Sequence, residues 1–182
     1  MQIGEEVKKV EAEADILYSE QEVEAAIDRM AKEITGALAG TDPLVLCVLI
    51  GGVIPTGKLL PRLRFPLTLD SIHATRYRGG LSGSDIEWIL KPRQPLQGRT
   101  VLVIDDVLDE GITLQAICDY CKDRGAKAVY SAVLVNKLLD RAKPHRADFL
   151  GLQADDRYLF GYGMDYKGYL RNAAGIYACK DS

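Results

Sequence analysis

The segment from Thr100 to Thr113, TVLVIDDVLDEGIT, constrains the fold more than any other part of this sequence. It begins with TVLVI, an apolar run typical of a strand that is buried on both faces. Four acidic residues follow, and a glycine and a threonine then open a predicted helix over residues 113–124. A buried strand that turns directly into a helix is the first half of a βαβ unit, so this segment predicts a parallel sheet.

Apolar runs and amphipathic stretches alternate along the rest of the chain. Ser19 and Glu22 have the spacing of a capping box, and an apolar stripe after them predicts a helix that ends near Gly36 and Gly40. A short helix is predicted over residues 54–63. Further strands are predicted over residues 43–50, 67–74, 86–90, 128–135, 149–152 and 158–161. This rhythm predicts a single α/β domain with a mostly parallel central sheet flanked by helices.

The composition excludes several classes of partner. The chain has 182 residues, which suits one domain with one core. Its net charge of −3 argues against nucleic acid or an anionic membrane as the main partner. No apolar run reaches the ~18 residues of a membrane span, and residues 1–13 lack the apolar stretch of a signal peptide. We therefore expect a cytoplasmic protein that binds small molecules.

The cysteines Cys47, Cys118, Cys121 and Cys179 are expected to be thiols, because disulfides are rare in the cytosol. Cys118 and Cys121 could form a redox or zinc pair. However, they fall well inside a predicted helix, and the sequence has no second closely spaced pair. We expect one of these two thiols in the core and the other near the surface.

The acidic segment offers two kinds of ligand at the carboxyl end of the predicted sheet, where open parallel sheets bind their ligands. The adjacent carboxylates of Asp105 and Asp106 are costly at a strand end unless they meet cations or hydroxyl groups. Gly111 and the start of the helix supply free backbone N–H groups and a positive dipole end, which favour a phosphate. A solvated acidic loop with an ordinary helix cap is the alternative interpretation. The pattern predicts phosphate binding beside carboxylates for a metal or ribose.

The segment from Val101 to Thr113 resembles the phosphoribosyl-diphosphate binding motif of the type I phosphoribosyltransferases. Other stretches resemble the hypoxanthine-guanine branch of that family, in the family's order. They are residues 48–52 (VLIGG), 133–137 (VLVNK) and 158–166 (YLFGYGMDY), followed by Arg171. The resemblance implies a type I phosphoribosyltransferase-like fold, with a core over about residues 36–152 and a small base-binding hood from residues 1–35 and 153–182.

The resemblance implies a role for each matching residue. Phosphoribosyl diphosphate would be bound by Ile50, Gly51, Asp105, Asp106, Asp109, Glu110, Gly111, Ile112, Thr113 and Arg171. The base would be bound by Lys137, Tyr158, Leu159 and Asp165. Lys137 would donate to the purine O6, Tyr158 would stack on the ring, and Asp109 would be the catalytic acid or base at N7. Mg²⁺ would be held by Asp165, with Asp105 and Asp106 contributing through water or the ribose.

The resemblance also implies a lid and a particular backbone feature. Residues 77–84 would form the lid, with Arg76 and Tyr77 where the family usually has Ser-Tyr. Ile50 and Gly51 would meet the pyrophosphate, often through a non-proline cis peptide. Four of the implied site residues also have an ordinary structural interpretation. Lys137 could be a plain strand-end lysine, Tyr158 a core aromatic residue, Asp165 a turn residue and Arg171 a surface cation.

Three residues depart from the family pattern. Ile50 stands where close relatives often have Lys, so a positive charge is lost beside the pyrophosphate. Glu110 stands where Thr is usual, and a carboxylate facing a phosphate would repel it. We therefore expect Glu110 to point outward or to pair with a cation. Arg76 could supply the missing charge.

The implied activity is purine salvage, in which 5-phosphoribosyl passes from phosphoribosyl diphosphate to hypoxanthine or guanine and gives IMP or GMP. A regulatory protein that senses phosphoribosyl diphosphate or nucleotides on the same fold is one alternative, because Glu110 and Ile50 could mark a lost activity. A transferase for xanthine or a pyrimidine is another. Lys137 and Tyr158 favour a 6-oxopurine. A homodimer or homotetramer is expected.

Overall fold

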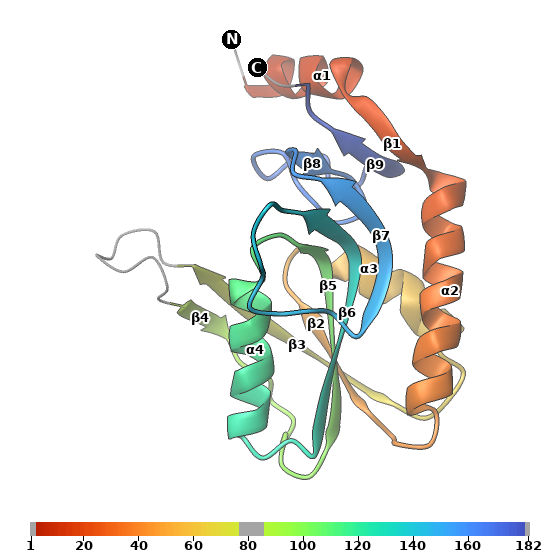
Figure 1. Cartoon of the computed structure of the whole chain (residues 1–182), viewed down its shortest axis with the longest axis vertical. Coiled ribbons are helices and arrows are strands. Elements are labelled where there is room, and N and C mark those ends of the chain that lie inside the picture. The colour runs from red at the N-terminus through yellow and green to blue at the C-terminus, as the bar shows by residue number, and fades with distance from the viewer. Residues whose placement is uncertain (1–2, 77–85, 181–182) are drawn as a thin grey trace.

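The computed structural model describes residues 3–76 and 86–180 (Figure 1). Its main sheet has six strands in the order β4-β3-β2-β5-β6-β7. The strands are β2 (Leu44–Val48), β3 (Thr68–Arg76), β4 (Ile86–Leu90), β5 (Thr100–Leu108), β6 (Ala128–Leu138) and β7 (Phe149–Asp155). All neighbours are parallel except β4, which pairs antiparallel with β3. The predicted α/β domain with a mostly parallel central sheet is confirmed.

Helices cover both faces of this sheet (Figure 1). Helices α2 (Glu20–Leu38) and α3 (Val53–Leu59), followed by the 3-10 turn η1 (Leu60–Arg62), lie on one face, and α4 (Ile112–Asp123) lies on the other. Strand β5 serves both layers because its side chains alternate. Leu102 and Ile104 belong to the core cluster under α2, whereas Val101 and Val103 belong to the cluster under α4. The continuous apolar run is therefore buried on both sides.

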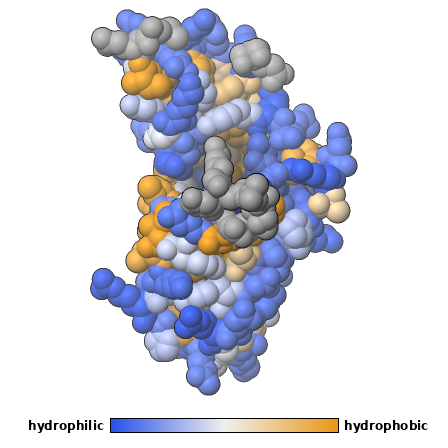
Figure 2. Space-filling model, turned by 90° about the vertical axis from the view of Figure 1, so that its left-hand side faces the viewer, coloured by the Kyte–Doolittle hydropathy of each residue, from blue (hydrophilic) through white to orange (hydrophobic). Residues whose placement is uncertain are grey.

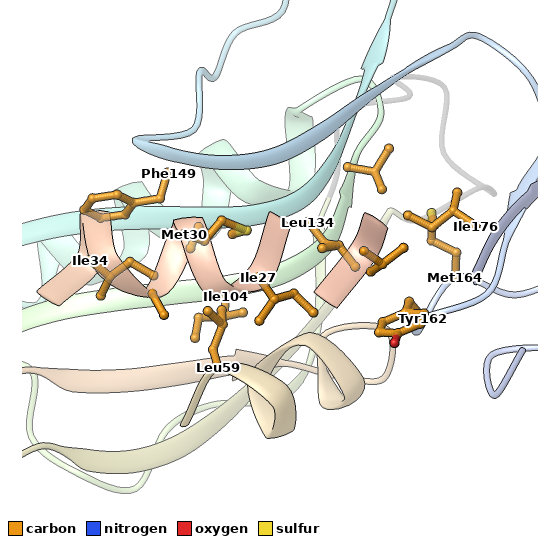
Figure 3. Packing of buried hydrophobic residues seen from close by; sticks show 14 of the residues in the cluster. Ile27, Met30, Ile34, Leu59, Ile104, Leu134, Phe149, Tyr162, Met164 and Ile176 are labelled. Atoms are coloured by element: carbon orange, nitrogen blue, oxygen red, sulfur yellow. The ribbon is translucent and has the colours of Figure 1, made fainter. Parts of the chain in front are cut away.

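Helix α2 begins where the sequence predicts. The Ser19 side chain accepts a hydrogen bond from the Glu22 backbone N–H, and the Glu22 carboxylate accepts one from the Ser19 N–H at 2.8 Å, which completes the capping box. Ile27, Met30 and Ile34 form the fully buried stripe of the helix and pack over the sheet (Figure 3). Burial of this stripe is what holds α2 on the large sheet.

A second, three-stranded antiparallel sheet lies near the carboxyl ends of β6 and β7 (Figure 1). Its order is β1-β9-β8, from β1 (Asp15–Ser19), β9 (Gly175–Ala178) and β8 (Leu159–Phe160). Strands β1 and β9 are not predicted from the sequence, and neither is the preceding helix α1 (Ile3–Glu13), in which Val7 is the buried residue. Such short elements with few apolar side chains carry little periodicity. Strand β1 of this small sheet ends at Ser19, and α2, which follows it directly, packs on the large sheet.

Four strands run past their predicted ends, and the extensions of β5 and β6 change the setting of the site. Strand β5 runs to Leu108 instead of ending at Ile104, and β6 runs to Leu138 instead of residue 135. The parallel pairing continues as far as Leu108 opposite Asn136. Asp105 and Asp106 therefore lie within a strand and not in the turn after it. Pairing between β5 and β6 extends both strands through these polar residues. The local sequence does not show this pairing.

The expectation for the cysteines of α4 is wrong in one respect. Cys118 and Cys121 are both buried, at 2% and 0% exposure, so neither lies near the surface. Both face the sheet beside Ile117, and burial raises the pKa of each thiol to about 12. All four cysteines are free thiols. Because the pKa of each thiol is raised, Cys118 and Cys121 are unreactive core residues.

The described surface is predominantly hydrophilic on the side that carries β4 and α4, with scattered apolar patches (Figure 2). None of the helices in residues 3–76 and 86–180 is long and apolar enough to cross a membrane.

Candidate active site

A cleft of about 380 Å³ opens where β2, β3 and β5 end. Its lining includes most of the residues expected to bind phosphoribosyl diphosphate. They are Gly51, Asp105, Asp106, Asp109, Glu110, Gly111, Ile112, Thr113 and Arg171, joined by Asp165 and Arg76. Ile50 is 56% exposed and is not among the lining residues. The fold thus gathers residues from four separate segments of the chain around one cleft.

The floor of the cleft depends on close approaches between glycine backbones and neighbouring groups. A Cβ atom at Gly51 would overlap the Asp106 carboxylate, and one at Gly163 would overlap the Gly51 carbonyl oxygen. At Gly52, a Cβ atom would lie 2.6 Å from the Val48 carbonyl oxygen. Only glycine fits such contacts. The non-proline cis peptide implied for this loop is present and joins Leu49 to Ile50.

Asp105 and Asp106 place two adjacent carboxyl groups beside this floor. Asp105 accepts a hydrogen bond from the Asp106 N–H at 2.9 Å, and Asp106 accepts one from the Val107 N–H at 2.8 Å. Burial raises the pKa of Asp105 well above its usual value, and the neighbouring Asp106 charge raises it further. Burial also raises the pKa of Asp106, against the attraction of Arg171. Such a pair is suited to a cation or to hydroxyl donors.

Helix α4 begins at the cleft with its first turn open. Gly111, the N-cap residue, has a φ of 81° and makes no side-chain capping bond. Its positive φ favours glycine, because other residues are strained there. The first N–H groups of a helix have no partner within the helix and carry its positive dipole end. The cradle formed by residues 109–113, which we call the phosphate loop, is therefore suited to an anion.

Glu110, the acidic residue of the phosphate loop, is paired with two cations. Its carboxylate contacts Arg76 at the end of β3 and Arg141 in the segment between β6 and β7. The expectation that Glu110 pairs with a cation is confirmed. The pairing reduces the negative charge that Glu110 would otherwise present to an anion in the cleft.

Asp109 and Lys137 lie at the ends of neighbouring parallel strands. Lys137 Nζ is 3.3 Å from Asp109 Oδ2 and 3.4 Å from Asp156 Oδ1. The Lys137 side chain is only 13% exposed, whereas that of Asp109 is 51% exposed. Lys137 lines an adjoining hollow of about 580 Å³, which shares Leu108 with the cleft. The fold thus brings together a mostly buried donor and an accessible carboxylate.

Asp165 and Arg171 belong to one network in the C-terminal region. Arg171 Nη2 is 2.7 Å from Asp165 Oδ1, and Arg171 Nη1 donates to the Gly163 carbonyl at 2.6 Å. Asp165 also accepts a hydrogen bond from the Gly168 N–H. In the part of the chain that the structure describes, no three His, Cys, Asp or Glu side chains are grouped to hold a metal by themselves.

The remaining expected residues lie outside the cleft lining. The Tyr158 side chain is 52% exposed and contacts the Tyr166 ring edge-on at a centroid distance of 5.5 Å. Leu159 is buried in β8. Tyr77 and the expected lid over residues 77–84 lie outside the described residues.

Two cations that contact this site are not predicted from the sequence. Arg141 binds Glu110, and Lys143 donates to the Leu108 carbonyl at the end of β5. Both lie in the segment between β6 and β7, which carries no matching motif. The signal available was the run of cations at Arg141, Lys143 and Arg146 directly after a strand.

Comparison with known proteins adds a family match. Residues 13–167 match the family model of the phosphoribosyl transferase domain. A hypoxanthine-guanine phosphoribosyltransferase of Aquifex aeolicus is 29% identical over 168 residues, which cover 91% of this chain and 94% of that protein. A bifunctional protein TilS/HprT of Listeria innocua is 33% identical over 158 residues, 86% of this chain but only 24% of that protein. This chain therefore spans about a quarter of the bifunctional relative.

A solved structure has the same fold. A mutant hypoxanthine phosphoribosyltransferase of Trypanosoma cruzi, in a ternary substrates complex, superposes with a TM-score of 0.86 at 28% identity. The match covers 93% of this chain and 97% of that one.

Proposed function

We propose, since this chain belongs to the phosphoribosyl transferase domain family, that it transfers 5-phosphoribosyl from phosphoribosyl diphosphate to hypoxanthine or guanine and releases pyrophosphate. The observation that carries the choice of base is the contact between Lys137 and Asp109 beside the phosphate loop. An ammonium donor and a carboxylate acceptor at adjacent strand ends complement O6 and N7–H of a 6-oxopurine.

The phosphate loop and the glycine-rich floor would hold the sugar substrate. Backbone N–H groups of the phosphate loop and the dipole of α4 would bind the 5′-phosphate. Asp105 and Asp106 would accept hydrogen bonds from the ribose hydroxyls, and Gly51 and Arg171 would meet the pyrophosphate. In this arrangement the anomeric carbon is fixed between the leaving group and the base, which is catalysis by positioning.

Asp109 would act on the proton at N7. As the bond from the anomeric carbon to pyrophosphate breaks and the bond to the base forms, positive charge develops on the purine. Asp109 would accept the N7 proton and relieve that charge. Lys137 would hold O6, and Tyr158, whose ring is half exposed, would stack on the base.

The donor set is suited to Mg²⁺ that arrives with the substrate. Mg²⁺ binds carboxylate oxygens and substrate phosphates together, and it uses only one or two protein carboxylates. Asp165 would be the direct ligand, with Asp105 and Asp106 contributing through water or the ribose. When bound, the ion supplies charge neutralisation on the departing pyrophosphate.

The decisive assay mixes the purified chain with phosphoribosyl diphosphate, Mg²⁺ and each base in turn and measures nucleotide formation. We expect IMP and GMP to form. Tight binding of phosphoribosyl diphosphate without turnover would instead favour the regulatory alternative, and preference for a pyrimidine would reject the assignment of Lys137. A cytoplasmic location and a homodimeric or homotetrameric assembly remain predictions.

A further inference from the structure

Lys143 lies in the segment between β6 and β7 and binds the ends of both central strands of the site. Its Nζ donates to the Leu108 carbonyl at 2.6 Å, to the Lys137 carbonyl at 2.6 Å and to Asn136 Oδ1 at 2.8 Å. A lysine ammonium has three N–H donors and no acceptor. The three oxygens therefore satisfy it completely, without a carboxylate partner among these bonds.

Two of these acceptors are backbone carbonyls at or next to the residues that would contact the base. Leu108 is the residue before Asp109, and the second carbonyl belongs to Lys137 itself. Strand pairing sets Leu108 opposite Asn136, and this is the last pair between β5 and β6. The bonds of Lys143 to Leu108, Asn136 and Lys137 join the two strand ends at that pair and one residue beyond it. The Lys143 ammonium group therefore links the strand ends that carry Asp109 and Lys137.

The surrounding residues support the same segment beneath the phosphate loop. The Cβ atoms of Lys143 and His145 lie 3.5 and 3.6 Å from the position of a Cβ atom on Gly111. His145 also links two elements, with Nε2 2.8 Å from Ser131 Oγ of β6 and Nδ1 3.2 Å from Gln115 Oε1 of α4. Partial burial lowers the pKa of Lys143 and of His145, both of which are half-buried.

We propose that Lys143 is a positioning residue that fixes Asp109 and Lys137 at the spacing needed to hold a purine base. The inference rests on the proposed function. The three hydrogen bonds described for Lys143 go to the strand ends and not to the glycine floor or Arg171, so we expect the pyrophosphate end of the cleft to be independent of it. The role predicts a split between the two ends of the site, which a general loss of stability would not produce.

The test compares Lys143→Met with wild type and with Lys122→Met, a matched control on the exposed side of α4, where Lys122 pairs with Asp119. Lys143→Met keeps the apolar stem and removes every donor. We expect kcat with guanine to fall about 10- to 100-fold, because charge-assisted hydrogen bonds are lost. Titration calorimetry should show GMP binding weakened about tenfold or more, with Mg²⁺-pyrophosphate binding within about threefold of wild type.

A second variant separates positioning from folding. Asn136→Ala removes one acceptor, so its effect on GMP binding should be largely absent when Lys143→Met is already present. Near-wild-type kcat and GMP affinity in Lys143→Met would overturn the proposal, as would equal loss of GMP and pyrophosphate binding. Absence of turnover in wild type would reject the proposed function instead, and the two calorimetric titrations would still decide the role of Lys143.

Discussion

Arg76 and Glu110 form an ion pair that joins the end of β3 to the phosphate loop. Both residues depart from the pattern that the sequence resembles, and the structure places the two departures in contact. Arg76 lines the cleft with Glu110, while Arg141 holds the other carboxylate oxygen. The unfavourable acid at the phosphate loop is thus matched by cations supplied from two other segments.

The first prediction is that these two substitutions compensate each other. Arg76→Ser should raise the KM for phosphoribosyl diphosphate about three- to tenfold, because the Glu110 charge then repels the phosphate with less opposition. The double variant Arg76→Ser with Glu110→Thr should return close to the wild-type KM. Steady-state kinetics of the four proteins measures the coupling, and purely additive effects would show that the pair does not serve the ligand.

Asp109 is expected to be the residue whose loss most affects the chemical step. Asp109→Asn should lower kcat about 10²-fold or more, because general acid–base catalysis contributes roughly 10²–10⁴-fold. The KM for phosphoribosyl diphosphate should change little. Asp123→Asn at the exposed end of α4 is the control. A near-normal kcat in Asp109→Asn would remove Asp109 from the mechanism.

Lys137 should determine which purine is accepted. Its ammonium can donate to a carbonyl at position 6 but cannot pair with the amino group of adenine. Adenine should therefore be at least about 10³-fold poorer than guanine in kcat/KM. Lys137→Gln should reduce this discrimination, because glutamine both donates and accepts. Competition assays with the two bases measure the ratio, and an unchanged ratio in the variant would assign base reading to another residue.

Removal of divalent metal should abolish turnover. Excess chelator is expected to stop nucleotide formation, and added Mg²⁺ should restore it, because pyrophosphate is a poor leaving group without charge neutralisation. The fold should persist, since the described carboxylates do not form a metal cluster that holds elements together. Circular dichroism with and without chelator checks this, and full activity in chelator would contradict the proposed chemistry.

The sequence by itself determined the elements whose signals are local. The capping box at Ser19, the stripe of α2 and the step from β5 into α4 all depend on residues within a few positions of one another. Burial on both faces of β5 follows from its unbroken apolar run. The need of Glu110 for a cation was also readable, because an acid beside a phosphate site must be neutralised or turned away.

Only the tertiary structure decided which residues meet these needs. Glu110 is separated by 34 positions from Arg76 and by 31 from Arg141, and Lys143 is 35 positions from Leu108. The burial of both Cys118 and Cys121 likewise depends on how α4 packs. Strand order and the course of the segment between β6 and β7 create these contacts. No local periodicity encodes them, because they form only when the parallel strands align their carboxyl ends at one edge of the sheet.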